Sequence, residues 1–350
     1  MTRRGLVVTT VHHPDDNRIR EKTIRALGER FLVEFAAREP GPSDSSGLTW
    51  IPLPGGRLRR NVAAWRLVLT RPADVISIHD PELLPLGVVA RLVRRRPVVF
   101  DMHEDVPNQI LTKAWIPFVL RPLISALSRL VLRVSEGVLT FTLAEDSYSR
   151  QLRSSHPVIA NHPEVDSLPR VGPDRHGIIY VGSVSEERGL VDAVRAGAAV
   201  GVPLTVVGPV SDELALRMRR IAAECGGSVN LTGRLPHGEA MELVSRSAVA
   251  LSPLHDLPNY RYSIPTKVLE YLAIGVPVAA SDLPATRAVT EGLQAVFLHR
   301  PGDVDSMVVA VRQALSPETA GLAEGQVDAV RSRFRWPAGR LVAIYEDLCR

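Results

Sequence analysis

A regular alternation of short apolar runs with longer helical stretches is the feature that most constrains the fold of this chain. Apolar runs at 6–10, 75–78 and 97–100 are separated by stretches of helical periodicity such as 18–30 and 82–95. Short buried strands that alternate with helices predict parallel sheets covered by helices on both faces. We therefore expect an α/β fold with doubly wound sheets that bind ligands at the carboxyl ends of their strands. The other elements expected in this half are strands at 32–36 and 137–140 and helices at 61–70 and 117–134.

The tetrad Asn161-His-Pro-Glu164 interrupts this alternation, and the same pattern then starts again. A chain of 350 residues ordinarily forms two domains. We therefore predict two Rossmann-like domains, at 1–158 and 159–332, and a final helical segment at 333–350. The second half is expected to hold strands at 178–181, 204–207, 229–231, 248–252, 276–280 and 295–298, with helices at 189–199, 211–225, 237–245 and 303–315.

Composition excludes several classes of protein. Two cysteines, Cys225 and Cys349, are too few for a disulfide framework or a zinc site. The chain has neither a signal-peptide pattern nor an apolar run of about 18 residues, so we expect a cytoplasmic protein without a spanning helix. Net charge is +7 for residues 1–158 and −3 for 159–350. The basic half suits an anionic acceptor or a membrane surface better than nucleic acid, because aromatic residues are only 5% and nucleic-acid motifs are absent.

Polar side chains follow three strands of the first predicted sheet, at 12–18, 79–82 and 101–105. His12, His13 and Asp16 could form a metal set, but no second cluster of firm spacing supports it, so a polar ligand-facing loop is favoured. His79 and His103 could instead hydrogen-bond neighbouring loops. Three polar clusters at corresponding strand ends favour a ligand site at this edge of the sheet. The loop after the first strand contains no glycine, which argues against a nicotinamide dehydrogenase.

The segment 260–284 joins a polar loop to a short helix and then to an apolar strand. Pro265 suits the first turn of this helix, Ser263 or Thr266 could cap it, and Gly275 is the expected stop. A helix that begins beside a ligand site directs its positive end at the ligand and favours an anion.

Two charged residues of this helix admit two interpretations. Lys267 lies in the first turn and Glu270 three residues further along the same face. Together they suit a ligand with both phosphate and hydroxyl groups, such as a nucleotide sugar. Alternatively, Lys267 is solvated and Glu270 is its salt-bridge partner.

Glycines end other strands of the second half. Gly182 opens a turn that carries Arg188 at its far side, and Gly208 and Gly233 follow the next two strands. Glycine permits close backbone approach, and arginine can bind phosphate oxygens with two donors. The later pair Asp303 and Asp305 resembles a metal-binding D-x-D, but its position before a helix favours a cap.

The segment 113–134 is apolar and carries Arg121, Arg129 and Arg133 along its length. These charges exclude a membrane-spanning helix. A basic amphipathic helix can lie on an anionic membrane. The same segment can equally pack in the helical layer of the sheet, and both interpretations stay open.

Several of these motifs identify a family. The segment 265–281 reads P-T-K-V-L-E-Y-L-A-I-G-V-P-V-A-A-S, and 180–190 reads Y-V-G-S-V-S-E-E-R-G-L. With L-T-V-V-G-P, V-N-L-T-G-R-L-P, A-L-S-P-L, H-D-P-E-L-L-P-L-G, F-D-M-H-E-D-V-P and F-R-W-P-A-G-R-L-V-A-I-Y-E-D-L, they resemble retaining GT-B glycosyltransferases of family four, a large bacterial family that uses nucleotide sugars. The likeness spans almost the whole chain. It implies a GT-B fold, with an N-terminal acceptor domain, a C-terminal donor domain and a last helix that crosses back.

The resemblance also implies roles for individual residues. Transfer would go from a nucleotide sugar, with UDP as the expected nucleotide, to a hydroxyl of a small, lipid-linked or polysaccharide acceptor. It would retain the anomeric configuration without a metal or other cofactor. The catalytic residues would be His103, Arg188 and Lys267. The donor residues would be Gly182, Ser183, Arg188, Gly208, Arg234, Leu235, Tyr262, Ser263, Thr266, Lys267 and Glu270, and the acceptor residues His13, Asp16, Arg18, His79, Asp80 and Glu104.

The chain departs from the family pattern at two positions. Tyr262 stands where the family usually has a glutamate that contacts the donor sugar, and Ser183 stands where many members have arginine. Both departures affect the identity of the donor sugar. Two further functions therefore remain as alternatives: a nucleotide-sugar epimerase, for which Glu104 and Asp105 are the only tempting acid–base pair, and a non-catalytic nucleotide-sugar-binding protein.

Overall fold

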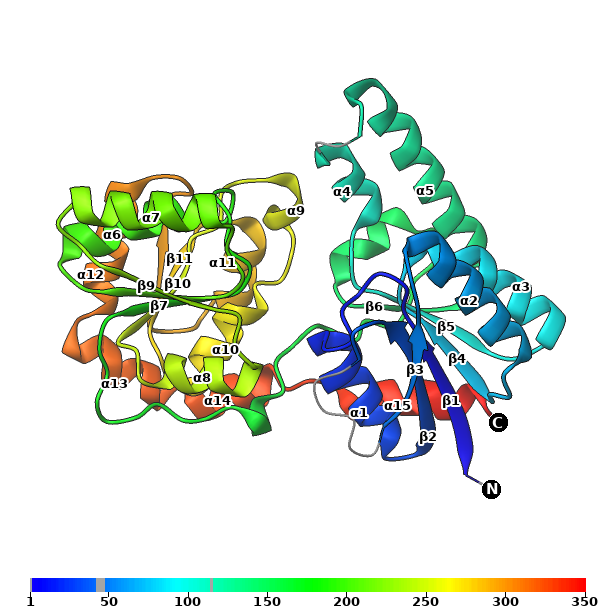
Figure 1. Cartoon of the computed structure of the whole chain (residues 1–350). Helices are drawn as coiled ribbons and strands as arrows, with labels where there is room; N and C mark the ends of the chain where they lie inside the picture. Colours follow the sequence, from blue (N-terminus) through cyan, green and yellow to red (C-terminus); the bar gives the residue numbers. More distant parts are fainter. Residues whose placement is uncertain (1, 42–47, 114–115) are drawn as a thin grey trace. The chain divides into compact units, whose positions relative to one another are not determined.

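The computed structural model describes residues 2–41, 48–113 and 116–350. The chain forms two compact units (Figure 1). Unit 1 comprises Met1–Asn161 and Trp336–Arg350, and unit 2 comprises His162–Arg335. The chain therefore leaves unit 1 at Asn161, three residues after the predicted limit, and its last segment belongs to unit 1. Among the described residues, none of the helices has the length and apolar character needed to cross a membrane.

Unit 1 is built on a six-stranded parallel sheet with the order β3-β2-β1-β4-β5-β6. β4 and β5 are buried throughout, as expected for central strands covered on both faces. The strand order reverses between β1 and β4, and in such sheets the ligand site lies at the carboxyl ends of the strands beside this reversal. The strands are β1 (Arg3–Val8), β2 (Phe31–Arg38), β3 (Thr49–Leu53), β4 (Val75–Ile78), β5 (Val98–Met102) and β6 (Thr140–Leu143).

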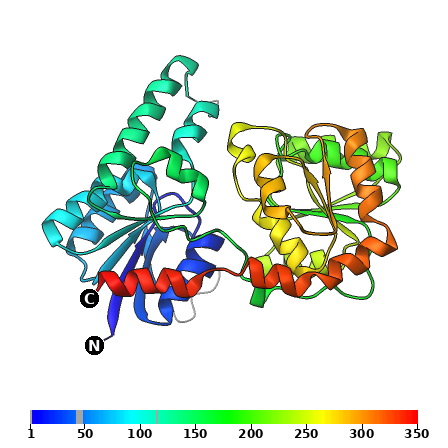
Figure 2. The ribbon, with the colours of Figure 1, turned by 180° about the vertical axis from the view of Figure 1, so that it is seen from behind.

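Helices cover both faces of this sheet. One apolar core forms under α2, α3 and α5, and a second forms on the opposite face, where α15 packs with η1 and α1 (Figure 2). Tyr345 ties α15 to the sheet, because its hydroxyl lies 2.8 Å from the Ser77 hydroxyl of β4. The helices are η1 (Asn17–Ile24), α1 (Arg25–Gly28), α2 (Arg57–Thr70), η2 (Pro81–Leu83), α3 (Leu84–Arg94), α4 (Val106–Thr112), η3 (Phe118–Leu120), α5 (Arg121–Ser135), η4 (Asp146–Gln151) and α15 (Ala338–Leu348).

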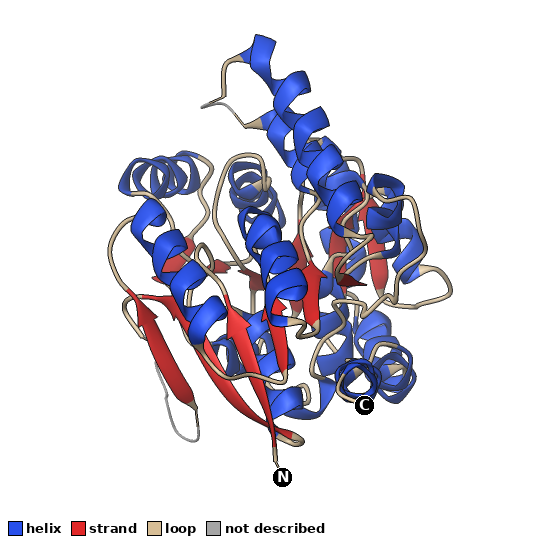
Figure 3. Ribbon diagram, turned by 90° about the vertical axis from the view of Figure 1, so that its right-hand side faces the viewer, coloured by secondary structure: helices blue, strands red, loops and turns tan. Residues whose placement is uncertain are grey.

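Unit 2 repeats the design with a second six-stranded parallel sheet, in the order β12-β11-β10-β7-β8-β9. Two apolar cores lie on its two faces, so this sheet too runs between layers of helices, as Figure 3 shows for the sheet of unit 1. The strands are β7 (Ile178–Val181), β8 (Leu204–Val207), β9 (Val229–Gly233), β10 (Val249–Ser252), β11 (Val278–Ser281) and β12 (Val296–His299). The helices are η5 (Val165–Ser167), α6 (Leu190–Val200), α7 (Asp212–Glu224), α8 (His237–Ser245), α9 (Pro258–Arg261), α10 (Thr266–Ile274), α11 (Pro284–Thr290), α12 (Val304–Ala314), α13 (Pro317–Gly325) and α14 (Val327–Arg333).

These two sheets confirm the predicted α/β fold, with local corrections. β3 was not predicted, and its proline, Pro52, is a residue that weakens the sequence signal of an edge strand. α4 was missed as well, and β6 begins at Thr140 rather than 137, because the N–H groups of Val138 and Leu139 donate to the carbonyl of Ser135 at the end of α5. β11 begins at Val278 because Pro277 lacks the N–H that the sheet requires.

Helix α10 ends at the predicted residue, but its N-terminal cap differs from the prediction. Gly275 ends the helix with a φ of 105°, as predicted. Its N-cap is Pro265, and no side chain caps it, so the predicted cap by Ser263 or Thr266 is wrong. Backbone carbonyls take the place of a cap, because the N–H groups of Thr266 and Val268 donate to the carbonyls of Ile264 and Pro265. At α12, the predicted cap is confirmed, since the Asp303 carboxylate accepts a hydrogen bond from the N–H of Ser306.

Candidate functional site

In unit 2, the most informative residue is Lys267, in the first turn of α10. The side chain as a whole is half-buried, but its ammonium group is out of contact with solvent and has no hydrogen-bond partner among the described residues. The Nζ atom lies 3.9 Å from the centroid of the Tyr180 ring. Burial and the charge of Arg188 lower the pKa of Lys267 to about 7, against the opposing effect of Glu270. The alternative of a solvated, salt-bridged lysine is therefore wrong.

Arg188 supplies a second cation to the same place. Its guanidinium carbon lies 5.4 Å from the centroid of the Tyr260 ring, and its charge acts on both Lys267 and the Tyr180 hydroxyl. The Tyr180 hydroxyl donates a hydrogen bond of 2.7 Å to the carbonyl of Ser183. Two cations at the start of a helix, held between aromatic rings, form a site that suits a ligand with two negative charges.

Two glycines allow the strand ends to approach this site. Gly182 has a φ of 139°, and a Cβ there would lie 2.8 Å from the Lys267 Nζ. Gly208 has a φ of 152°, and a Cβ there would lie 1.8 Å from the carbonyl oxygen of Gly182. Both positions therefore require glycine, for backbone conformation and for space. The ends of β7 and β8 and the start of α10 thus converge on one small region.

Glu270 lies one turn along α10 and has a partner that the sequence did not predict. The Nε2 of His237, the first residue of α8, lies 3.0 Å from its Oε1. Glu270 itself is 8% exposed, so this contact fixes the direction of its carboxylate. The two residues are 33 positions apart, and no local pattern links them. The other carboxylate oxygen has no hydrogen bond to the part of the chain that the structure describes, so it can accept one from a ligand hydroxyl.

The other predicted donor residues are less closely tied to this region. Arg234 follows β9 and is exposed, as is Tyr262, and the side chains of Leu235, Ser263 and Thr266 are half-buried. Ser183 is exposed at the turn that carries Arg188. For these residues a donor contact stays a prediction. His255 and Asp256, two polar residues just before α9, contact Asp192 and Arg261, respectively.

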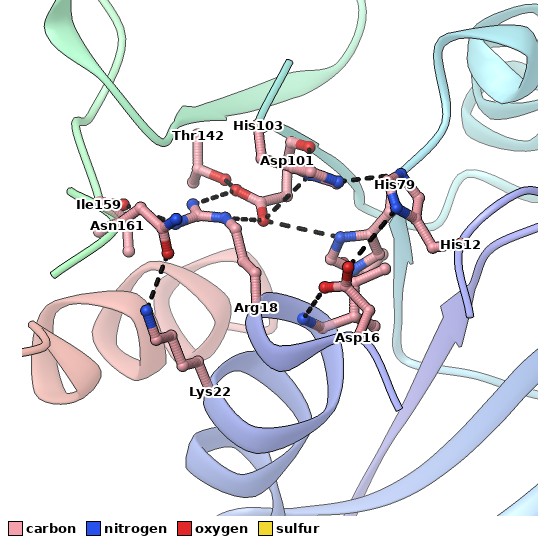
Figure 4. Close-up of polar contacts among 12 residues, drawn as sticks. His12, Asp16, Arg18, Lys22, His79, Asp101, His103, Thr142, Ile159 and Asn161 are labelled. Atoms are coloured by element: carbon pink, nitrogen blue, oxygen red, sulfur yellow. Dashed lines mark hydrogen bonds and ion pairs between the residues drawn. The ribbon is translucent and has the colours of Figure 1, made fainter. Parts of the chain in front are cut away.

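In unit 1, the three predicted polar clusters meet at the carboxyl ends of β1, β4 and β5 (Figure 4). The rings of His12 and His103 are tilted by 53°, with centroids 4.6 Å apart, and their Nε2 atoms are 3.0 Å apart. The ring of His79 lies 5.7 Å from that of His103. The structure therefore brings these three strand ends together through the histidines, and a ligand site there stays a prediction.

The hydrogen bonds decide which histidine carries the proton. The Nδ1 of His103 lies 2.9 Å from the backbone carbonyl of Asp101 and must donate to it. The contact between the two Nε2 atoms needs one donor and one acceptor, and the charged His12 is the donor. Burial opposes a charge on His12, but the carboxylates of Asp16 and Asp80 outweigh it and raise the pKa of His12 to about 9. His12 is thus an imidazolium at neutral pH.

Arg18, predicted to contact the acceptor, proves to be buried. It is 5% exposed, and its Nε and Nη2 donate to the Asp101 carboxylate at 2.8 and 2.7 Å. Its Nη1 donates to the carbonyl of Ile159. Burial opposes the charge of Asp101, but Arg18 holds the pKa of that carboxyl well below its usual range. Arg18 is therefore a structural residue of the site, which corrects the prediction.

His79 and Asp80 also lie beneath the site surface. They are 2% and 1% exposed, respectively. His79 contacts the Ser77 hydroxyl, and burial lowers the pKa of its imidazole to about 3. Asp80 accepts hydrogen bonds from the Thr9 hydroxyl and the N–H of Thr10. The prediction that they contact an acceptor is therefore corrected: they support the loop that carries His12. Among the predicted acceptor residues, His13, Asp16 and Glu104 are the ones with partly accessible side chains.

The same cluster does not fit a metal ion. His79, Asp101 and His103 each offer an atom within 4.8 Å of the others. However, the Arg18 guanidinium binds both oxygens of Asp101. A cation beside those oxygens repels a metal ion, and both oxygens already accept hydrogen bonds. The donor set therefore favours the ion pair with Arg18 over a metal.

Comparison with known proteins places this geometry in a family. The family model for glycosyl transferases group 1 matches residues 175–317, which include Gly182, Arg188, Lys267 and Glu270. Residues 175–317 form a glycosyl transferases group 1 domain. The match lies within unit 2, so the cationic region around Lys267 belongs to the group 1 domain of this enzyme.

Relatives and solved structures extend the likeness beyond this domain to most of the chain. The phosphatidyl-myo-inositol mannosyltransferase of Mycobacterium leprae is 27% identical over 342 residues, which cover 91% of this chain and 84% of that protein. The 2-deoxystreptamine glucosyltransferase of Streptomyces kanamyceticus is 24% identical, covering 72% and 71%. Sucrose-phosphate synthase from Thermosynechococcus elongatus has a TM-score of 0.78 at 16% identity over 99% of both chains. Anabaena HepE, solved with UDP and glucose, has a TM-score of 0.73 at 12% identity over 99% of this chain and 98% of that chain. These structures confirm the GT-B fold.

The charged His12 predicts a pH-dependent stability of unit 1 in this glycosyltransferase. Because its folded pKa of about 9 exceeds the usual 6.5, its contribution is complete below about pH 6.5 and is lost as pH rises through 9. We expect His12→Gln to lower the free energy of unfolding by about 1–3 kcal/mol at pH 6 and by almost nothing at pH 10. Urea titrations followed by tryptophan fluorescence measure this, since all four tryptophans fall in unit 1.

His13→Gln is the matched control for this prediction, because the neighbouring side chain is partly exposed and belongs to the same loop. It should change the unfolding free energy little, at either pH. If His12→Gln lowered the free energy of unfolding equally at pH 6 and pH 10, then packing, rather than the imidazolium charge, would stabilise the loop.

Proposed function

We propose that this glycosyltransferase moves a hexose from a UDP-sugar to an acceptor hydroxyl, with retention of anomeric configuration and without a metal. The observation that carries the proposal is the Lys267 ammonium, which is buried beside Arg188 at the start of α10 without a hydrogen-bond partner among the described residues. A buried cation in such surroundings is costly unless an anion compensates it. The diphosphate of a nucleotide sugar supplies that anion.

The proposed chemistry follows from where charge develops. Cleavage of the bond between sugar and phosphate leaves a nucleoside diphosphate with increased negative charge. Arg188, Lys267 and the positive end of the α10 dipole stabilise this charge, which lowers the barrier without a metal. The leaving phosphate then takes the proton from the acceptor hydroxyl as the hydroxyl attacks the same face of the sugar. His103 is the residue of unit 1 that we assign to the transferred sugar.

The names of the relatives support the proposed classes of donor and acceptor. Their names describe a mannosyltransferase and a glucosyltransferase, and HepE binds UDP and glucose in its crystal structure, which supports a UDP-hexose donor here. The free oxygen of Glu270 is assigned to the ribose hydroxyls. We keep small-molecule, lipid-linked and polysaccharide acceptors as the acceptor classes, with action in the cytoplasm at the inner face of the membrane.

The alternative epimerase function would require Glu104 and Asp105 as an acid–base pair. Asp105 caps α4, where its carboxylate accepts hydrogen bonds from the N–H of Asn108 and from the side chains of Asn108 and Gln151. A carboxylate that is used in this way is a poor general base. The geometry therefore favours transfer over epimerisation.

A thermal-shift panel tests the donor. We expect UDP to raise the melting temperature more than GDP, dTDP or ADP at equal concentration, with a stabilisation of about 2.7 kcal/mol at 100 times the dissociation constant. EDTA should leave this shift unchanged. A larger shift with GDP would refute the UDP assignment, and a shift that EDTA abolishes would refute metal independence. NMR of the products separates the reactions, because an epimerase would convert the donor to an isomer without an acceptor.

A further inference from the structure

The outward face of α5 carries apolar side chains where a surface helix ordinarily carries polar ones. Its exposed residues are Pro122, Leu123, Ala126, Leu127, Leu130 and Val134, and none of them is charged. Leu123, Leu127 and Leu130 are 67%, 57% and 51% exposed. Their spacing of three and four residues places them along one stripe of the helix. A continuous apolar stripe on a protein surface marks a site of interaction.

The hydrogen bonds of Ser125, Arg129 and Arg133 in α5 are made on the inner side of the helix. The Ser125 hydroxyl donates to the carbonyl of Pro107, and Arg129 and Arg133 donate to the side chain and backbone carbonyl oxygens of Gln151. These bonds fix the rotation of the helix about its axis. The apolar stripe therefore faces outward because the inner contacts require it.

The same surface continues onto η3, just before α5. Phe118 and Val119 are 79% and 81% exposed. The Arg121 guanidinium lies 5.7 Å from the Phe118 ring, and its Nε donates to the carbonyl of Ile116. Figure 1 shows the α4–α5 pair extending beyond the rest of unit 1. Phe118, Val119, Leu123, Leu127, Leu130 and Val134 together form what we call the apolar stripe.

The helical layer that carries the stripe is strongly basic. α2, α3 and α5 contain four, two and three arginines, respectively, and their sequences contain no aspartate or glutamate. Arg59, Arg66 and Arg91 are exposed on this layer. Apolar side chains flanked by arginines complement a surface that is apolar inside and negatively charged outside. An anionic lipid bilayer has these properties.

We propose that unit 1 docks on an anionic bilayer through the apolar stripe, whose leucines and phenylalanine enter the interfacial region while the arginines contact lipid phosphates. This docking goes beyond the proposed transfer reaction and does not depend on it. α4 begins at Val106, three residues after His103, so the hairpin that carries the stripe leaves the polar site directly. If the proposed function holds, a docked unit 1 presents that site to lipid-linked acceptors.

A second copy of the chain is the other occupant that an apolar stripe could accept. A two-fold contact through α5 would bring the arginine-rich layers of both copies close together. No carboxylate of α2, α3 or α5 is available to compensate the repulsion, because these helices have none. The charge pattern therefore favours the bilayer.

Vesicle flotation of the full chain tests the proposal. Wild-type protein should float with vesicles of phosphatidylcholine and phosphatidylglycerol, and float far less with phosphatidylcholine alone or at high salt. The triple variant Leu123→Gln/Leu127→Gln/Leu130→Gln should bind the anionic vesicles at least about tenfold more weakly. Leu216→Gln/Val309→Gln in unit 2, where the side chains are 66% and 54% exposed, is the matched control and should bind as wild type does.

Two further measurements keep this test decisive. Tryptophan fluorescence on urea unfolding should be unchanged in the triple variant, because the replaced side chains are exposed, and the UDP-induced thermal shift should also persist, which separates docking from donor binding. Equal flotation of the triple variant and wild type would overturn the proposal. The proposal would also be overturned if wild type were a dimer, the triple variant were a monomer, and neither protein bound vesicles.

Discussion

Replacement of Lys267 by methionine is expected to abolish transfer while making the protein more stable. The ammonium is buried without a hydrogen-bond partner among the described residues and faces the charge of Arg188, so it destabilises the folded state in the absence of an anion. Exchange of a buried charge for an apolar side chain of similar volume stabilises by about 1–4 kcal/mol. Loss of a group that stabilises developing charge lowers kcat by roughly 10²–10³. Urea unfolding by circular dichroism and UDP release from the donor measure the two effects.

The sign of the pH dependence follows from the lowered pKa of Lys267. The folded value of about 7 lies below the ordinary 10.5, so the unfolded chain binds more protons between these two pH values. The destabilisation is complete below pH 7 and is relieved as pH rises toward 10.5. The stability gained by Lys267→Met should therefore shrink over this range. UDP affinity should fall above pH 7, by at most tenfold per pH unit, because the neutral amine no longer attracts the diphosphate.

Arg220→Met is the control, since this arginine of α7 is 70% exposed at its side chain. It should alter neither donor turnover nor unfolding by more than about 0.5 kcal/mol. A Lys267→Met protein that is less stable than wild type would show that the ammonium already has a compensating partner. The assignment of this region to the diphosphate would then lose its main support.

The second large effect is expected at the buried ion pair of unit 1. Arg18→Met leaves the Asp101 carboxylate buried without its cation, and removal of one partner of such a pair costs about 3–5 kcal/mol. Asp101 still accepts from Thr142 at 2.9 Å, which compensates only one oxygen. Tryptophan fluorescence is a suitable probe, because the Arg18 guanidinium lies 5.3 Å from the Trp336 ring. The urea midpoint of unit 1 should fall accordingly, while unit 2 is unaffected.

An exposed pair offers a matched comparison. Arg71 donates to both oxygens of Glu34 at 2.8 and 2.9 Å, in the same bidentate geometry as Arg18 with Asp101. Because Arg71 is 43% exposed at its side chain, Arg71→Met should cost only about 0–1 kcal/mol. The double variant Arg18→Met/Asp101→Leu should recover much of the stability that Arg18→Met loses. Equal costs at the two pairs would mean that burial does not govern the strength of the Arg18 contact.

Much of the fold was predictable because its signals are local. Central strands such as β4 and β7 are short apolar runs, and both agree with the predicted ranges. Gly275 ended its helix as expected, because a left-handed residue at that position favours glycine. Errors arose where a local signal was weak or misleading, as at the edge strand with Pro52 and at the uncapped start of α10.

The candidate site was predictable only in part, since its side chains pair across long stretches of sequence. Motif and spacing indicated Lys267 and Gly182, which the structure brings together. Neither motif nor spacing reveals that Arg18 binds Asp101, 83 residues away, or that His237 holds Glu270. The outward direction of the α5 stripe was likewise hidden, because it depends on inward bonds to Gln151.

Calorimetric titration of UDP into wild type, Lys267→Met and Arg220→Met tests the central claim most directly, namely that the group 1 domain binds a nucleoside diphosphate through Lys267. We predict saturable binding to wild type and Arg220→Met with similar affinity, and a loss of at least about tenfold in Lys267→Met, which corresponds to one charge-assisted contact. Binding of UDP with equal affinity to all three proteins would contradict it.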